Sequence, residues 1–287
     1  MSIEVKNLSH IYMQGTLTEA FALTDVSFTV EDGEFIGLIG PTGSGKSTLI
    51  QHLNGLLKPT SGTVLVDGVD IWSKGVSLKE IRRKIGLVFQ YPEQQVFEET
   101  VFDDIAFGPR NLGYSPEEVE RSVEAARQVV GLDKELLSRS PFDLSGGQLR
   151  RVAVAGILAM NPEVLVLDEP AAGLDPKGRK EILDNIKKLH ESGITVILVS
   201  HNMEDVAYFC QRILVLYDGT LIADGAPREV FTKEKLIDSI GLKPPEVTIV
   251  MRKLRQRGWS VREDVLTVEE GFEEILRCLG TKGVALI

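Results

Sequence analysis

Short runs of aliphatic residues recur along the first two hundred residues and define the expected architecture. They occupy positions 35–39, 63–66, 85–89, 164–167 and 195–199. Runs of this length without polar alternation are typical of strands that are covered on both faces of a sheet. Because helical patterns lie between several of these runs, the sequence predicts an α/β core.

Two other patterns surround this core. Residues 3–30 alternate apolar and polar positions, with a break at Gln14-Gly15, which predicts antiparallel strands in a β subdomain. The stretch from about 108 to 160 has no strand pattern and is expected to form a helical subdomain. Within it, Ser115-Pro116-Glu117-Glu118 combines an N-cap, a first-turn proline and a capping-box glutamate, so we expect a helix from there to about residue 130.

The pattern changes again near residue 233. Lys243-Pro244-Pro245 marks a linker, which we place at residues 234–245. Residues 246–287 alternate helix and strand patterns, with Thr267-Val268-Glu269-Glu270 as a second capping box. We therefore expect a large domain over residues 1–233, a linker, and a small α/β appendage over residues 246–287.

Composition narrows the possible partners. The 287 residues carry a net charge of −10, which argues against DNA or RNA as the main partner because a phosphate backbone selects basic surfaces. The cysteines, Cys210 and Cys278, are compatible with a reducing cytosol. Residues 1–5 resemble the start of a strand and not a signal peptide, and the longest apolar run, residues 152–160, is too short to cross a bilayer. If the protein works at a membrane, another chain would have to supply the path across it.

A glycine-rich stretch between an expected strand and an expected helix is the strongest chemical signal. Gly40-Pro41-Thr42-Gly43-Ser44-Gly45-Lys46-Ser47-Thr48 fits the pattern G-x-x-x-x-G-K-[ST]. Its glycines let backbone N–H groups turn toward phosphates, and the helix N-terminus adds a positive dipole. We expect Lys46 to reach the β- and γ-phosphates and the Ser47 hydroxyl to bind Mg²⁺. The alternative is a glycine-rich turn with a chance lysine.

Two carboxylates follow the aliphatic run at residues 164–167. Asp168 at a strand end beside a phosphate-binding loop suits Mg²⁺ coordination through water. Glu169 would then project where a water could attack the γ-phosphate, as a general base. A solvated strand end is the plainer interpretation.

A second phosphate-binding nest is predicted at Leu144-Ser145-Gly146-Gly147-Gln148, which precedes an apolar helix carrying Arg150 and Arg151. One nucleotide does not need two nests from one subunit. We therefore expect Ser145, Gly147 and Gln148 to serve a nucleotide held by another subunit. A plain N-cap turn is the alternative.

Taken in order, these stretches resemble an ABC transporter ATPase over about residues 3–230. Gln90 and His201, each after an expected strand, complete the resemblance. The appendage and several local stretches are similar to the ATPases of energy-coupling factor (ECF) importers, in which two similar but distinct ATPases pair; which of the two this chain resembles stays open. These stretches are Phe89-Gln90-Tyr91-Pro92-Glu93-Gln94-Gln95, Phe97-Glu98-Glu99-Thr100-Val101 and Pro170-Ala171-Ala172-Gly173-Leu174-Asp175-Pro176.

The resemblance implies roles for further side chains. Tyr12 matches the aromatic residue that stacks on adenine, with Phe21 as a rival candidate. Gln90 would touch Mg²⁺ and the attacking water and report to a transmembrane partner. Asp175 would cross to the second subunit, and His201 would contact the γ-phosphate. The other histidines are expected to be structural: His10, His52 and His190.

The acidic stretch 93–104 is a candidate partner surface. Its large apolar residues are Val96, Phe97, Val101 and Phe102. An apolar groove rimmed by carboxylates suits a partner helix that carries arginine. The carboxylates considered for this pairing are Glu98, Glu99, Asp103 and Asp104.

We therefore expect an ATPase that binds ATP and Mg²⁺ and energises an ECF-type importer of a vitamin or metal ion. We expect it to be a peripheral protein on the cytoplasmic face of the cell membrane. Its expected partners are a second ABC ATPase subunit (a distinct paralogue, or otherwise a second copy), a transmembrane coupling subunit and a membrane substrate-binding subunit, and no nucleic acid. A conventional importer ATPase would lack the ECF-like stretches. A mechanochemical ABC ATPase acting on nucleic acid or ribosomes usually carries two modules or long coiled coils.

Overall fold

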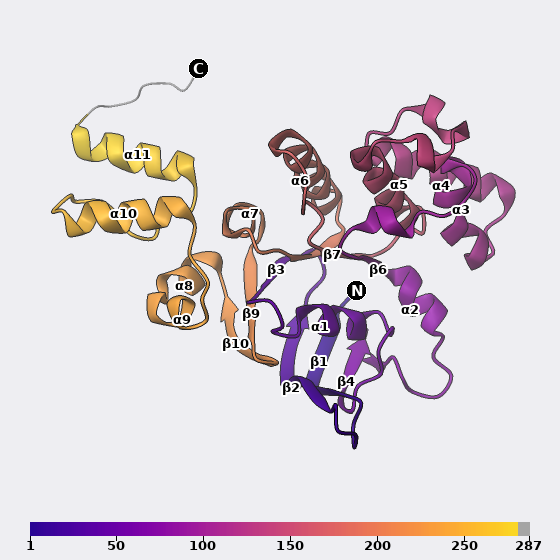
Figure 1. Cartoon of the computed structure of the whole chain (residues 1–287), viewed down its shortest axis with the longest axis horizontal. Helices are drawn as coiled ribbons and strands as arrows, with labels where there is room; N and C mark the ends of the chain where they lie inside the picture. Colours follow the sequence, from indigo (N-terminus) through magenta and orange to yellow (C-terminus); the bar gives the residue numbers. More distant parts are fainter. Residues whose placement is uncertain (281–287) are drawn as a thin grey trace.

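The computed structural model describes residues 1–280 and contains two sheets (Figure 1). The smaller sheet is antiparallel, with the order β2-β1-β4-β5. Its strands are β1 (Ile3–Tyr12), β2 (Ala20–Val30), β4 (Ser61–Val66) and β5 (Val69–Asp70). The alternation over residues 3–30 thus forms the expected antiparallel pair.

The larger sheet has the order β10-β9-β3-β8-β7-β6 and is parallel except at its β10 edge. Its strands are β3 (Phe35–Ile39), β6 (Ile85–Val88), β7 (Val164–Asp168), β8 (Thr195–Val199), β9 (Arg212–Tyr217) and β10 (Thr220–Gly225). Every residue of β3, β6, β7 and β8 is buried, as the aliphatic runs predict. The run at 63–66 differs, because Val64 and Val66 alternate with half-buried neighbours and β4 belongs to the smaller sheet.

Both faces of the larger sheet are covered, which explains its aliphatic composition. On β3, Phe35 and Ile39 pack into a core shared with the helices of the 101–209 region. Ile36 and Leu38 point the other way, into a core shared with the smaller sheet and α1 (Lys46–Leu53). The strand period of two residues thus divides one aliphatic run between two cores.

Among the remaining helices, α6 and α7 lie over one face of the larger sheet, and the others gather at its two edges (Figure 1). Beyond the β6 edge lie α2 to α5, and α8 to α11 lie beyond the β10 edge. Their bounds are α2 (Leu78–Lys84), α3 (Val101–Leu112), α4 (Pro116–Val129), α5 (Gly146–Leu158), α6 (Pro176–Glu191), α7 (Met203–Phe209), α8 (Pro227–Thr232), α9 (Glu234–Ser239), α10 (Glu246–Gln256) and α11 (Val268–Leu279). Short 3₁₀ helices span η1 (Pro92–Gln95), η2 (Lys134–Ser138) and η3 (Pro141–Asp143).

The expected helical region at about 108–160 forms three α-helices, the first of which already begins at Val101. The Ser115 capping box is present in both directions, with the Ser115 side chain on the Glu118 N–H and the Glu118 side chain on the Ser115 N–H. At the second predicted box, Thr267 caps α11 by accepting from the Glu270 N–H. The Glu270 carboxylate instead accepts from the Leu266 N–H at 3.0 Å.

The appendage differs from its prediction. Residues 246–280 form α10 and α11 and no strand, and half of the expected linker is the helix α9; residues 281–287 lie outside the described part of the chain. The apolar residues that resembled a strand instead pack together: Met251, Val261 and Val265 form a small core between the two helices.

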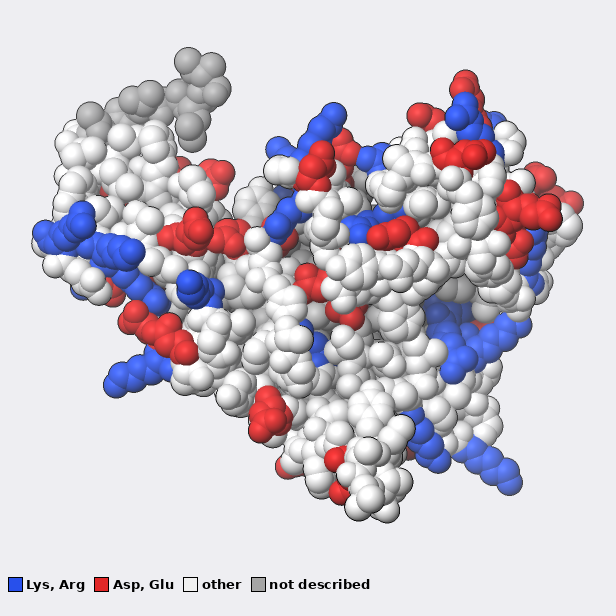
Figure 2. Space-filling model, viewed as in Figure 1, with Lys and Arg blue, Asp and Glu red and all other residues white. Residues whose placement is uncertain are grey.

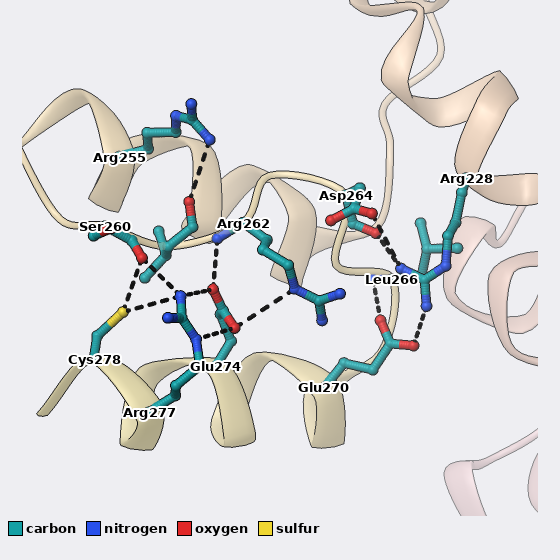
Figure 3. Close-up of polar contacts among 11 residues, drawn as sticks. Arg228, Arg255, Ser260, Arg262, Asp264, Leu266, Glu270, Glu274, Arg277 and Cys278 are labelled. Atoms are coloured by element: carbon teal, nitrogen blue, oxygen red, sulfur yellow. Dashed lines mark hydrogen bonds and ion pairs between the residues drawn. The ribbon is translucent and has the colours of Figure 1, made fainter. Parts of the chain in front are cut away.

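Charged side chains fasten the segment between α10 and α11 (Figure 3). The buried Glu274 carboxylate accepts from the Arg262 N–H at 2.7 Å and from Arg277 Nε at 2.9 Å. These donors lower the pKa of Glu274 to about 2, with Arg277 as the largest cause. Arg228 of α8 contacts Glu270 and donates to the Asp264 carbonyl at 2.6 Å, which joins the appendage to the rest of the chain.

Among residues 1–280, no helix has the length and apolar character needed to span a membrane.

Candidate nucleotide site

The glycine-rich loop leaves the C-terminal end of β3 and leads into α1. Gly43 and Gly45 adopt left-handed backbone conformations, with φ of 82° and 99°. A Cβ on Gly45 would lie 2.4 Å from the carbonyl oxygen of Ala22, so this position is closed to other residues. The loop therefore presents backbone rather than side chains to a ligand.

Lys46 and Ser47 open the helix that follows. The Lys46 ammonium donates to the carbonyl oxygens of Gly40 and Pro41 at 2.8 and 2.9 Å. Its burial lowers its pKa, and the nearby carboxylates of Glu169 and Asp168 oppose this shift. A phosphate in the loop would offer the ammonium stronger, charged acceptors in place of these carbonyls.

Ser47 and Asp168 meet although they are far apart in sequence. Ser47 Oγ donates to Asp168 Oδ2 at 3.0 Å. Asp168 is buried at the end of β7, and this burial raises its pKa. A hydroxyl and a buried carboxylate are oxygen ligands that suit Mg²⁺, which usually takes one or two protein ligands together with substrate phosphates. Residues 1–280 contain no cluster of three His, Cys, Asp or Glu side chains that could hold a metal alone.

Glu169 follows at the strand end with a φ of 52°, and its N–H donates to the Val199 carbonyl at 3.0 Å. Within the described chain, its buried Oε1 has no hydrogen-bond partner, and His201 Nε2 lies 3.5 Å away. Burial, followed by the neighbouring Asp168, raises the pKa of Glu169 to about 7. Burial likewise lowers the pKa of His201. A carboxylate with such a pKa and one buried oxygen free of hydrogen bonds within residues 1–280 is suited to accept a proton from water.

Two further predicted residues lie at loop ends and are exposed. Gln90 follows β6, two residues after its end. Asp175 caps α6, where its side chain accepts from the Gly178 N–H at 2.8 Å. Both therefore emerge at the C-terminal side of parallel strands, where open α/β sheets place their ligands.

The predicted second nest forms the N-terminus of α5. Ser145 and Gln148 make a complete capping box, and Ser145, Gly146 and Gly147 are exposed. Among residues 1–280, no hydrogen bond or ion pair links this turn to Gly40–Thr48 of the same chain. The same turn therefore caps α5 through the side chains of Ser145 and Gln148 and leaves its backbone exposed to a ligand.

The aromatic candidates lie on neighbouring strands. Tyr12 and Thr48 place their hydroxyl oxygens 3.2 Å apart, which ties Tyr12 to the phosphate-binding loop. Phe21, paired with Ile11 in the register of β1 and β2, is more exposed. Both remain candidates for contact with a base.

A buried histidine pair supports this corner of the site. His52 Nδ1 lies 2.7 Å from the Thr48 carbonyl, and His52 Nε2 lies 3.1 Å from His10 Nδ1. Burial lowers the pKa of His52 to about 4, so the ring is neutral at pH 7. These histidines are structural, as expected.

The predicted partner surface is only partly exposed. Val96 and Val101 are buried in the core, so the expectation that they face a partner is wrong; Phe97 is 58% exposed. Asp104 Oδ2 accepts from the backbone N–H groups of Phe97 and Glu98, at 2.8 and 2.9 Å.

Other members of that surface also have partners within the chain. Asp103 forms a 2.8 Å ion pair with Arg110, and the Arg110 guanidinium lies over the ring of Phe102. Helix capping and core packing therefore account for much of the alternation of acidic and apolar residues in this stretch.

A groove of about 580 Å³ nevertheless lies beside Phe97. Its apolar wall comes from α3 and α5, and basic side chains of α2 line the opposite wall, where Figure 2 shows Lys and Arg gathered in a hollow. Its lining includes Phe97, Phe107, Ile157, Met160, Lys79, Arg82, Arg83 and Asp104. Because the charged lining is mainly basic, the expectation of a groove rimmed by carboxylates is wrong.

One buried residue with no predicted role connects several of these loops. Arg150 of α5 is 3% exposed and bonds to Glu93 and to two backbone carbonyls near Glu169. The sequence indicated this residue only as an arginine beside an apolar helical stretch.

Comparison with known proteins identifies the family. The sequence profile described as ABC transporter matches residues 23–172. The energy-coupling factor transporter ATP-binding protein EcfA2 of Caldanaerobacter subterraneus subsp. tengcongensis is 57% identical over 286 residues, which cover 99% of this chain and 100% of that protein. The protein of the same name from Clostridium tetani is 55% identical over 284 residues, covering 98% and 99%.

Solved structures show the same fold. CbiO1 from Clostridium perfringens, described as part of the ABC transporter complex cbiONQ, matches with a TM-score of 0.72 and 36% identity, over 87% of this chain and 98% of that one. The cassette MJ0796, solved as a dimer bound to ADP and Pi, matches with a TM-score of 0.69 and 32% identity, over 78% and 98%.

Proposed function

The chain belongs to the ABC transporter family, as an ATP-binding and ATP-hydrolysing subunit of an energy-coupling factor importer, and we propose that it drives uptake of a vitamin or metal ion through membrane partners. The observation that carries the catalytic part is the buried Oε1 of Glu169, which has no hydrogen-bond partner among residues 1–280, beside the Ser47–Asp168 hydrogen bond. A base and a metal-ligand pair thus flank one phosphate-binding loop.

We assign the nucleotide as follows. The backbone of Gly40–Thr48 and the Lys46 ammonium hold the phosphates of ATP, while Tyr12, or else Phe21, contacts adenine. Ser47 and Asp168, with Gln90, hold Mg²⁺, which when bound neutralises phosphate charge. Phosphoryl transfer depends mainly on positioning and on charge stabilisation.

The reacting water is handled by two side chains. The Glu169 carboxylate accepts its proton, and His201, 3.5 Å away, contacts the γ-phosphate. Gln90 orients the water at the loop that leads to the groove.

A second ATPase subunit would complete each site. Ser145, Gly147 and Gln148 of this chain would bind the γ-phosphate of a nucleotide held on the partner's phosphate-binding loop, and Asp175 would cross the same interface. The exposed turn supports this, as does the dimeric state of MJ0796. The similarity to ECF ATPases, in which two similar but distinct ATPases pair, favours a distinct paralogue over a second copy of this chain.

The appendage belongs with this pairing. We propose that residues 1–233 form the ATPase domain and that residues 234–245 link it to the appendage. Residues 246–287, the appendage, would contact the second ATPase subunit. Exposed apolar side chains on α11 support that role: Val268 is 71% and Leu279 59% exposed.

The groove beside Phe97 would receive a helix of the transmembrane coupling subunit, on the cytoplasmic face of the membrane. Gln90 and Phe97 lie on one connected segment, so contacts at the nucleotide and at the groove can share one conformational change. The separate substrate-binding membrane subunit would select the transported molecule.

Replacing Phe97 by Asp is expected to release the chain from its membrane partners. A carboxylate placed in a contact that becomes desolvated costs several kcal/mol, so recovery of the complex should fall about tenfold or more. The measurement is affinity purification from membranes through a tag on this chain, with mass spectrometry of the co-purified proteins.

Val69→Asp is the matched control, because Val69 is 53% exposed on β5, outside the groove. Recovery of equal amounts of membrane partner with Phe97→Asp and Val69→Asp would place the coupling surface elsewhere. Recovery of a conventional permease would favour the conventional importer, and recovery of ribosomes or nucleic acid the mechanochemical alternative.

A further inference from the structure

Arg150 is a charged residue enclosed by three separate segments of the chain. Its Nε and Nη2 donate to the two carboxylate oxygens of Glu93, at 3.1 and 3.2 Å. Its Nη1 donates to the carbonyl oxygens of Ala172 and Pro170, at 2.7 and 3.2 Å. Only 4% of the side chain is exposed, so these bonds replace its contacts with water.

The acceptors belong to loops that carry candidate site residues. Glu93 lies in η1, three residues after Gln90. Pro170 and Ala172 form the turn after Glu169, which the Ala172 N–H closes by donating to the Glu169 carbonyl at 3.1 Å. The same turn leads to Asp175. One guanidinium thus holds the loop of Gln90 and the turn of Glu169 against α5.

The helix that bears Arg150 reaches both proposed contacts of the subunit. Its first turn presents Ser145 and the exposed glycines. Further along, Ala153, Gly156 and Ile157 line the groove beside Phe97. Since an α-helix transmits displacement along its length, movement at either end changes the position of Arg150.

We propose that Arg150, with Glu93, is a positioning clamp that makes the Gln90 loop, the Glu169 turn and α5 move as one unit. The inference rests on the proposed function, since it needs nucleotide at one end and partners at the other. The donors of Arg150 are bound to Glu93, Pro170 and Ala172. Arg150 acts by fixing where Gln90 and Glu169 lie when the subunits close.

The chemistry of the contact requires arginine. A planar guanidinium can pair with both oxygens of a carboxylate and still direct its other nitrogen at two carbonyls. A lysine ammonium keeps the charge but cannot span these acceptors in one plane. Arg150→Lys should therefore retain stability better than function.

The test uses the complete transporter, purified through this chain, with Arg150→Met, Arg150→Lys and Glu93→Gln. We expect kcat for ATP hydrolysis to fall about tenfold or more in Arg150→Met, as loss of hydrogen bonds between charged groups allows, while KM for ATP stays within about twofold. Combining Arg150→Met with Glu93→Gln should add little further loss, because both changes break the same clamp.

Arg127→Met is the matched control. Arg127 also pairs with a glutamate, Glu124, and donates to a carbonyl, that of Leu132 at 2.9 Å, but in the helical region away from the nucleotide loops. A merely structural role for Arg150 predicts that both arginine variants lose thermal stability together and that neither separates kcat from KM.

The clamp is refuted if Glu93→Gln, in a stably assembled complex, keeps kcat within about twofold of the unmodified protein. This variant decides the question even if Arg150→Met does not assemble. An inactive unmodified complex would instead refute the proposed function, so the two failures are distinguishable.

Discussion

Replacing Glu169 by Gln is expected to leave ATP bound and the paired subunits closed, while hydrolysis falls by about 10²–10⁴-fold. Glutamine keeps the size of the side chain and can still form hydrogen bonds, but its amide cannot accept a proton from water. The buried Oε1 lies 3.5 Å from His201 and has no hydrogen-bond partner within residues 1–280, so it is positioned for that proton.

Phosphate release and nucleotide binding by the purified complex check this prediction. Glu163→Gln is the control, because Glu163 precedes the opposite end of β7 and its carboxylate makes a long contact with Lys84, at 4.0 Å. Near-normal turnover by Glu169→Gln would remove Glu169 from the role of base. Loss of ATP binding would show instead that the carboxylate supports the loop.

Replacing Ser145 by Arg is expected to block closure of the ATPase pair without preventing ATP binding to the isolated chain. The bulky cation would fill an exposed turn that the proposed partner nucleotide must approach. Hydrolysis by the complex should fall about tenfold or more, since removing one charge-stabilising contact of a transition state already costs that much.

Ser115→Arg separates this effect from loss of a helix cap. Ser115 makes the same capping box on α4 that Ser145 makes on α5. Cap loss alone typically costs about 1 kcal/mol of stability and should be similar in both variants. Unchanged ATP-dependent association of the Ser145→Arg chain, measured by light scattering or by a distance probe between subunits, would contradict the shared site.

Local sequence patterns predicted the elements that hold the nucleotide site. The glycine-rich loop, Asp168, Glu169 and Ser145 each lie at the junction of a strong strand or helix signal and a turn, so their surroundings follow from neighbours in sequence. The same holds for the capping box at Ser115.

What failed depended on contacts between distant residues. Val101 is fully buried because helices from elsewhere cover α3, and the local acidic–apolar alternation does not contain that information. Arg150 and Glu93 are 57 positions apart. In the appendage, apolar residues that resembled a strand pack between two helices.

The most direct measurement of the central claim is ATP hydrolysis by the assembly captured from membranes through this chain. We predict a complex that contains a second ATPase subunit and membrane proteins, hydrolyses ATP, and loses that activity when only Glu169 of this chain becomes Gln or when Ser145 becomes Arg. Capture of the chain without any membrane protein, with full ATP hydrolysis that neither substitution affects, would contradict it.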